Sequence, residues 1–446
     1  MGHERNHASR ELMQRFFRAE LSRGAARQIV QHLLARCPEC LDTAQEIGSE
    51  EGFTEGGEDP ERYHEIFVRL LRNADEIEAE IVRERLRGMD LWACLEKHPQ
   101  ERRLLMIRND PRMQRWGLYE RLLDKTRETG FRNPAEAVDI AHLALAVVEE
   151  LDPGHYGEER LADFRAAALA ALGNAQRLAS DFSGAELSFG QAQEALSQGT
   201  GDPLEKATLI SFRASLLKDQ GEFEQAVRLM DRTIAIYREL NDLHLEGRTL
   251  LQQAATIGFV HPERGVQLAE RGLALIDSLR EPRLELCGRH ALAHFLNDAG
   301  QPREALAMLE MSRPVYARFK DTWTRTRLHW LEGKIARNLG DLSQAEETFQ
   351  RLWGDLQEPS YAHELTLLSI DLAEVYTARG KHEDAAQIVA EFLPMLRSWG
   401  MHTEGLAMWL LLQEAVQSRT AQTTTFRSVA EYMHRAWYRP LRDRLG

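Results

Sequence analysis

The chain has 446 residues, a formal net charge of −14 and a hydrophobic fraction of 43%. Such a chain can bury a sizeable core, which excludes a wholly disordered or collagen-like protein. The negative net charge gives the chain no general attraction to nucleic acid or to an anionic membrane. No run approaches the roughly 18 apolar residues of a membrane span, and residues 1–10 lack the apolar stretch of a signal peptide. We therefore expect a cytoplasmic protein without direct nucleic-acid or membrane partners.

Residues 1–47 are expected to form a small helical head that ends in two closely spaced cysteines. His32, Cys37 and Cys40 fall within nine residues of one another. Thiolates and imidazoles suit zinc, and a structural zinc site needs four such ligands. A unit this small does not fold on core burial alone, so a bound metal is physically expected. Pro38 disfavours helical geometry at Cys37, so a helix should end just before that cysteine.

The head resembles the zinc-binding anti-sigma fold, whose motif is an upstream His or Cys followed by H-x3-C-x2-C. The resemblance implies a structural Zn²⁺ held by His32, Cys37, Cys40 and an upstream histidine, either His7 or His3. It also implies that the head holds a sigma factor. One extra residue between His32 and Cys37 departs from the family spacing. Two other interpretations stay open, namely a redox C-P-x-C motif and buried cysteines without a metal.

Residues 48–60, GSEEGFTEGGEDP, have the composition of a linker. They carry four glycines, a proline and a run of acidic residues, with almost nothing to bury. Residues 61–101 are predicted to form one or two helices that bridge into the next segment.

From residue 102 to residue 417 a similar phrase recurs at a nearly constant interval. Small residues that would open the second helix of each unit stand 39 to 41 residues apart, at Ala185, Ala226, Val266, Ala305, Ala345 and Ala385. A glycine ends the preceding helix in four units, at Gly221, Gly300, Gly340 and Gly380. One such helix pair cannot cover its own apolar face, whereas stacked pairs bury a continuous core. The pattern therefore predicts an α-solenoid.

The repeat resembles the tetratricopeptide repeat, most closely in LGNAQRLASDFSGAE at residues 172–186. There Leu172, Gly173, Phe182 and Ala185 fall on the small and large anchor positions of the family. The period of about 40 residues is longer than the family's 34. The resemblance implies an all-α, right-handed solenoid of helical hairpins whose groove binds a protein or peptide. Another kind of α-solenoid is the alternative.

Alignment of the repeats places a mixed set of side chains on the groove side of the first helices. The set is mainly polar with one aromatic residue, which suits a peptide or a protein helix better than a small metabolite. His290 and His294 could hold a metal only with a third ligand, and none stands at a suitable spacing. The predicted groove residues are Asn174, Arg177, Ser211, Ser215, Lys218, His290, His294, Asn297, Trp330, Lys334 and Arg337.

Residues 418–446 break the repeat and should form a terminal capping helix over residues 426–445. This helix is locally basic, so contact with an acidic partner is the alternative to capping. No P-loop, HExxH or GxSxG motif is present, and we expect no enzyme activity. The sequence favours a regulatory adaptor whose zinc head holds a sigma factor while the groove binds a second protein. The alternative is a scaffold or peptide sensor that controls an effector enzyme, with a purely structural head.

Overall fold

The computed structural model describes residues 9–17, 29, 33, 37–50, 79–130, 132–356, 361–398, 401 and 403–438. None of these residues forms a strand, and the regular structure is helical throughout, which confirms the predicted all-α class. The chain divides into two compact units, Met1–Ala179 with Gln191–Thr200, and Ser180–Gly190 with Gly201–Gly446. Within the described ranges, no helix is long and apolar enough to cross a membrane. Most of the expected linker, residues 51–60, lies outside these ranges.

The head of the first unit contains α1 (Arg10–Phe17) and α3 (Pro38–Glu50), which pack against each other. Cys37 is not helical, and α3 begins at Pro38, because proline fits the first position of a helix, where no backbone donor is needed. The helix continues past residue 47, the expected end of the head. A small buried cluster joins the elements: Met13, Ile29, Cys37, Cys40, Ala44 and Ile47.

The rest of the first unit is a series of antiparallel helices. A helix of residues 79–95 is followed by α5 (Gln100–Asn109), the 3-10 turn η1 (Pro111–Met113), α6 (Trp116–Gly130), α7 (Pro134–Glu149), α8 (Pro153–Tyr156) and α9 (Glu158–Leu178). The helix of residues 79–95 crosses α6 at two glycines, since a Cβ on Gly88 would lie 2.1 Å from the carbonyl oxygen of Gly117. Helix α10 (Phe182–Ser197) contributes to both units.

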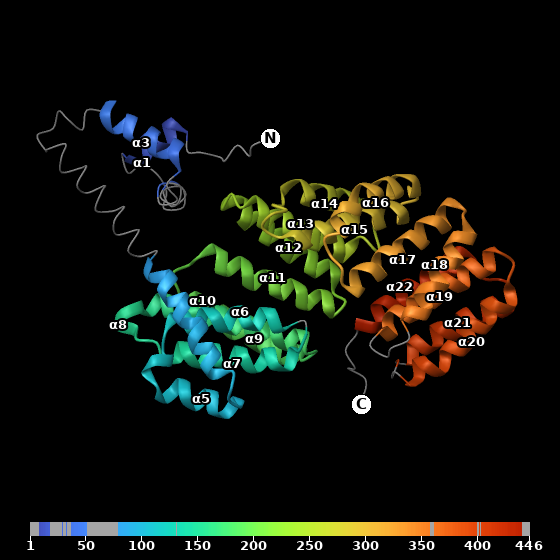
Figure 1. Ribbon diagram of the computed structural model, residues 1–446, viewed down its shortest axis with the longest axis horizontal. Helices are drawn as coiled ribbons and strands as arrows, with labels where there is room; N and C mark the ends of the chain where they lie inside the picture. Colours follow the sequence, from blue (N-terminus) through green and yellow to red (C-terminus); the bar gives the residue numbers. More distant parts are fainter. Residues whose placement is uncertain are drawn as a thin grey trace, which may run out of the picture. The chain divides into compact units, whose positions relative to one another are not determined.

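Five helical hairpins build the second unit (Figure 1). They are α11 (Pro203–Asp219) with α12 (Phe223–Glu239), α13 (Leu243–Ile257) with α14 (Pro262–Leu275), α15 (Pro282–Asp298) with α16 (Pro302–Tyr316), α17 (Thr322–Leu339) with α18 (Leu342–Asp355), and α19 (Ala362–Ala378) with α20 (His382–Ser398). Second helices begin 39 or 40 residues apart, in agreement with the predicted period. Gly221, Gly300, Gly340 and Gly380 all have positive φ at the intervening turns, also as predicted.

The predicted small anchors hold the paired helices close together. Ala226, Ala305, Ala345 and Ala385 have no exposed surface. The prediction of Val266 was wrong by one residue, because Gly265 occupies the equivalent fourth position of α14. A Cβ on Gly265 would lie 2.7 Å from the Cα of Gly258 and 2.9 Å from the Phe295 ring. This crossing is therefore too close for any residue other than glycine.

Two further helices, α21 (Thr403–Gln417) and α22 (Thr423–Tyr438), follow the last hairpin. Helix α22 begins three residues before the expected start at 426. It packs against α21 and also against α19, three helices earlier (Figure 1). Its buried side chains Phe426, Val429 and Met433 join the core that includes Trp409 and Phe392. A terminal helix that packs in this way faces the first helices of the repeats.

Candidate functional site

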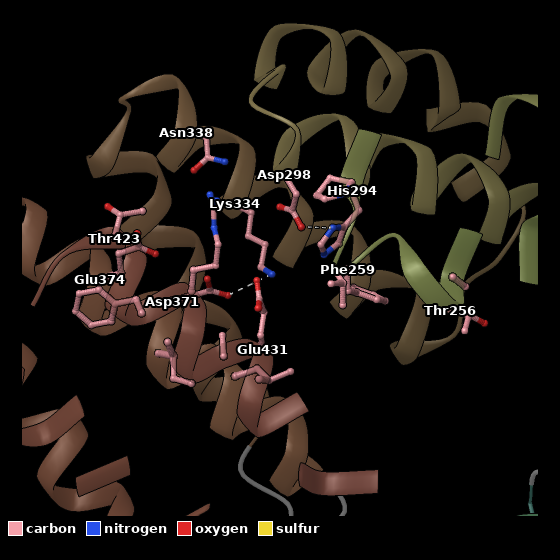
Figure 2. Close-up of a pocket in the computed structure, with 18 of the residues that line it drawn as sticks. Thr256, Phe259, His294, Asp298, Lys334, Asn338, Asp371, Glu374, Thr423 and Glu431 are labelled. Atoms are coloured by element: carbon pink, nitrogen blue, oxygen red, sulfur yellow. Dashed lines mark ion pairs between the residues drawn. The ribbon is translucent and has the colours of Figure 1, made fainter. Parts of the chain in front are cut away.

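The second unit contains a pocket of about 470 Å³, the central pocket, lined by one face of the repeat helices. Its wall is built from α11, α13, α15, α17 and α19, the first helices of the five hairpins, together with α22. A narrower cavity of about 60 Å³ shares Phe259, His294, Arg327, Lys334 and Leu367 with it. Figure 2 shows side chains from α13, α15, α17, α19 and α22 converging on one space. The repeat geometry thus brings together lining residues that are spread along the sequence from Lys218 to Glu431.

Six of the eleven predicted groove residues line these two cavities: Lys218, His290, His294, Trp330, Lys334 and Arg337. Two others, Ser211 and Ser215, do not line them, and the Ser215 hydroxyl donates a hydrogen bond to the Ser211 carbonyl at 3.1 Å. Asn297 is also absent from the lining, and 1% of its surface is exposed. Asn174 and Arg177 belong to the first unit, where the Arg177 Nε donates to the Asn174 Oδ1 at 3.0 Å.

A buried ion network forms one wall of the central pocket. The Nη1 of Arg337 lies 2.7 Å from Oδ1 of Asp371 and 2.6 Å from Oε2 of Glu374. The Trp330 indole donates to the other Asp371 oxygen at 2.7 Å. The Lys334 ammonium lies 3.8 Å from Asp371 and stacks over the Trp330 ring, 5.6 Å from its centroid. Each charge therefore has an opposite charge beside it, as buried ions require.

The network sets the charge state of its carboxylates. Burial alone would raise the pKa of Asp371, but the charges of Lys334 and Arg337 and the hydrogen bonds from Trp330 and Arg337 outweigh it, so the net shift is downward. Burial raises the pKa of Glu374, and Arg337 only partly offsets that effect. Asp371 is thus the more strongly ionised partner of the shared arginine.

Two histidines on α15 form a second polar group in the site. The Nδ1 of His294 lies 3.0 Å from Oδ2 of Asp298 (Figure 2), and His290 shares a hydrogen bond of 2.7 Å with the Tyr316 hydroxyl. Burial, followed by the positive charges of His294, Arg327 and Lys334, holds the pKa of His290 well below its usual value. No serine or cysteine occurs among the described residues that line either cavity, so the His294–Asp298 pair has no such nucleophile beside it. The arrangement suits binding.

An apolar turn borders these charges. The turn between α13 and α14 places Phe259 and Val260 at the pocket with 37% and 45% of their surfaces exposed. The Phe259 ring contacts His294 edge-on, with ring centroids 5.3 Å apart. Exposed aromatic surface next to satisfied ion pairs is typical of a site that covers an apolar group of a ligand.

The sequence carried signals for the residues that the groove prediction missed. The other four repeats have a glycine two residues before their second helix, and Val260 stands at that position in the turn that also contains Phe259. The absence of this glycine distinguishes the turn in the sequence. A shift of the predicted groove positions by one further repeat of 40 residues carries Lys334 to Glu374 and Trp330 to Ile370. Asp371 is the residue after Ile370. The contributions of α22, which include Thr423, Phe426 and Glu431, follow from no repeat rule, because α22 does not continue the array.

The predicted metal site is described in part. Cys37 and Cys40 are both buried, with 4% and 1% of their surfaces exposed; Cys37 immediately precedes α3 and Cys40 lies in its first turn. His3, His7 and His32 lie outside the described residues. Two buried thiols at this spacing match the donor chemistry of zinc.

Comparison with known proteins defines the class. Family models of the tetratricopeptide repeat match residues 207–242, and residues 288–311 and 367–391. These matches identify tetratricopeptide repeats at those residues of the second unit, where the helical hairpins recur every 39 or 40 residues. No curated protein sequence matches the chain.

Solved structures share the fold at low sequence identity. A Rap protein complexed with competence and sporulation factor has a TM-score of 0.53 and 12% identity, covering 72% of this chain and 87% of that one. Aspartyl phosphate phosphatase F from Bacillus subtilis has a TM-score of 0.49 and 13% identity, covering 95% and 98% of the respective chains. The first similarity shows a shared helical-repeat fold.

Proposed function

We propose that the chain is a non-enzymatic regulatory adaptor that binds a segment of another protein, or a peptide, in the central pocket. The observation that carries this proposal is the exposed apolar turn of Phe259 and Val260 inside a pocket walled by five repeat helices. Monomeric proteins rarely leave such surface open beside a cavity unless it meets a ligand or a partner.

The lining fits a polypeptide better than a uniformly apolar or uniformly charged ligand. Basic and acidic side chains are balanced: Lys218, Arg327, Lys334, Arg337 and Arg427 face Asp219, Asp298, Asp371, Glu374 and Glu431. Between them lie apolar patches that can take alternate side chains of an extended segment. Supporting this reading, the Rap protein of similar fold was crystallised with a bound factor, competence and sporulation factor.

The test is a pull-down with two variants of the full-length chain, followed by affinity measurement on each recovered partner. Phe259→Ala removes an exposed ring at the pocket and should weaken binding by about tenfold to thirtyfold, the usual range for an aromatic hot spot of roughly 1.4–2 kcal/mol. Leu279→Ala is the matched control, because Leu279 is 90% exposed and does not line the pocket. Equal binding by both variants and the wild type would place the functional surface elsewhere.

For the head, we propose a structural zinc site formed by His32, Cys37, Cys40 and His7 or His3. The observation in its favour is the burial of both cysteines in one small cluster at the start of α3. Such a cluster is too small to hold its elements together alone, so a metal would supply stability. The head would then hold a sigma factor or a similar helical partner, and in the alternative it would only stabilise a scaffold that controls an effector enzyme.

Metal analysis tests this second proposal. Wild-type protein should carry about one zinc per chain, and Cys37→Ser or Cys40→Ser should lose it. Cys94→Ser is the control, since Cys94 is exposed and lies outside the head. If the Cys37 and Cys40 variants keep the zinc content of the wild type, the ligand assignment fails. A sigma factor that binds the wild type but not Cys37→Ser would separate the adaptor from the scaffold.

A further inference from the structure

Two cations of the central pocket, Arg327 and Arg427, have no ion pair among the described residues, and of these two Arg327 also lines the narrower cavity. Arg327 on α17 is half-buried and lines both cavities. Among the described residues, no carboxylate lies within ion-pair distance of its guanidinium, whose recorded contact is with the Trp323 ring at 5.3 Å. Arg337, ten residues further along the same helix, pairs with two carboxylates. A half-buried guanidinium without an acid offers its donors to a ligand.

Nitrogen-bearing side chains surround Arg327 in the narrower cavity. The narrower cavity is lined by His290, His294, Arg327, Lys334 and His363, and Glu364 is the one acidic side chain in its described lining. Burial is the main cause of the lowered pKa of His290, and His294, Arg327 and Lys334 lower it further. His294 and Lys334 already contact Asp298 and Asp371, so Arg327 is the permanently charged basic side chain of the described lining without an ion pair.

The dimensions fit a small anionic group attached to a larger apolar one. A cavity of about 60 Å³ holds roughly two waters, which is enough for a carboxylate. The adjoining central pocket, with Phe259 and Leu367 at the junction, has room for neighbouring side chains. Glu431 of α22 points toward the Lys334 ammonium from the other side (Figure 2).

We propose that the narrow end of the pocket is a carboxylate-binding subsite, with Arg327 as the principal partner and Lys334 beside it. This proposal rests on the proposed function and specifies the ligand, which is a peptide segment with a carboxylate next to an apolar side chain. The planar guanidinium binds both oxygens of a carboxylate, which fixes the orientation as well as the position of the segment. Either a C-terminal carboxylate or an Asp or Glu side chain supplies this group.

The experiment uses three N-acetylated pentapeptide libraries with the full-length chain. The first has free C-termini and no Asp or Glu, the second is amidated and contains Asp and Glu, and the third is amidated and contains neither. Peptides that co-elute with the protein are identified by mass spectrometry. We expect enrichment from the first library if the ligand's C-terminus occupies the subsite, and from the second if a side chain does. The third library should show none.

Binding of the enriched peptides is then measured with charge variants. Arg327→Gln should weaken binding by about tenfold to a hundredfold, the range for loss of a charged hydrogen bond. Arg327→Lys should recover part of this loss. Arg325→Gln is the control, because Arg325 lies on the same helix, is exposed and does not line either cavity.

The outcomes distinguish the two proposals. Peptides from the acid-free amidated library that bind as well as the others, and that lose binding with Phe259→Ala, would overturn the carboxylate subsite while leaving the pocket as a peptide site. Unchanged binding of acidic peptides to Arg327→Gln would overturn it as well. If no library is enriched at all, the subsite and the proposed peptide-binding function both fail.

Discussion

At the scale of single residues, the site depends on a shared arginine. Arg337 is 16% exposed and holds Asp371 and Glu374, whose side chains are 11% and 12% exposed. Removing charges like these from water is costly, so the group is stable only while each member keeps its partners. The network therefore fixes the wall of the central pocket and the position of Lys334 and Trp330 within it.

Asp371→Asn tests this role. The substitution keeps the shape of the side chain but removes its charge, which leaves Arg337 with Glu374 alone. We expect the free energy of unfolding to fall by about 3 kcal/mol at pH 7, measured by urea denaturation. Glu310→Gln is the control, because the exposed Glu310–Arg313 pair on α16 should contribute less than about 1 kcal/mol.

The same variant predicts a pH dependence. The pKa of Asp371 is lower in the folded chain than in the unfolded one, because the charges of Lys334 and Arg337 and its hydrogen bonds outweigh the effect of burial. Its contribution to stability is therefore complete above the unfolded pKa of about 4 and is lost as pH falls through the folded pKa. The stability difference between wild type and Asp371→Asn should narrow below about pH 4. A difference that stays constant down to pH 3 would contradict the assigned role.

At the scale of the helical hairpin, the inter-helix turn determines what the pocket presents. Four turns use a glycine with positive φ, a conformation that satisfies the end of the first helix. Between α13 and α14 the equivalent residue is Val260, and the turn carries Phe259 to the pocket instead. The turn between α13 and α14 therefore lacks the positive-φ glycine of the other four turns and presents apolar side chains to the pocket.

Paired glycine substitutions test the turn argument. Gly300 has φ of 78° and open space where a Cβ would stand, so Gly300→Ala should cost about 1 kcal/mol through backbone strain alone. Gly190 lies inside α10 and also has open space, so Gly190→Ala should instead stabilise the chain by about 0.5–1 kcal/mol. Chemical denaturation measures both. Shifts of the same sign would show that the turn conformation does not control stability here.

The repeat period, the turn glycines and most of the anchors could be predicted from sequence, because each depends on local spacing. The anchor of α14 was misplaced by one residue because Val266 looks like the other small anchors, whereas the close approach of Gly258 and Phe295 that demands Gly265 is tertiary. Six groove residues follow from the repeat register for the same local reason. The contribution of α22 could not be predicted, since its packing on α19 depends on a contact between non-neighbouring helices.

At the scale of the whole molecule, the chain has two compact units, and each proposal belongs to one of them. The zinc site and the sigma-factor contact are proposed for the head in the first unit, and the peptide site for the second. Since the two proposals share no residue, Cys37→Ser and Phe259→Ala should each affect one partner and spare the other. A chain organised in this way can join two binding events in one molecule.

Hydrogen–deuterium exchange of the full-length chain, with and without its bound peptide or partner, tests the central pocket most directly. Residues 255–262, 327–338 and 423–431 are far apart in sequence and meet at this pocket. We predict slower exchange in all three segments when the wild type binds its ligand. Because Phe259→Ala binds more weakly, the same ligand concentration should slow exchange less in this variant. Unchanged exchange in these segments, with protection of residues 79–95 or of α1 and α3 instead, would contradict the assignment of the pocket as the binding site.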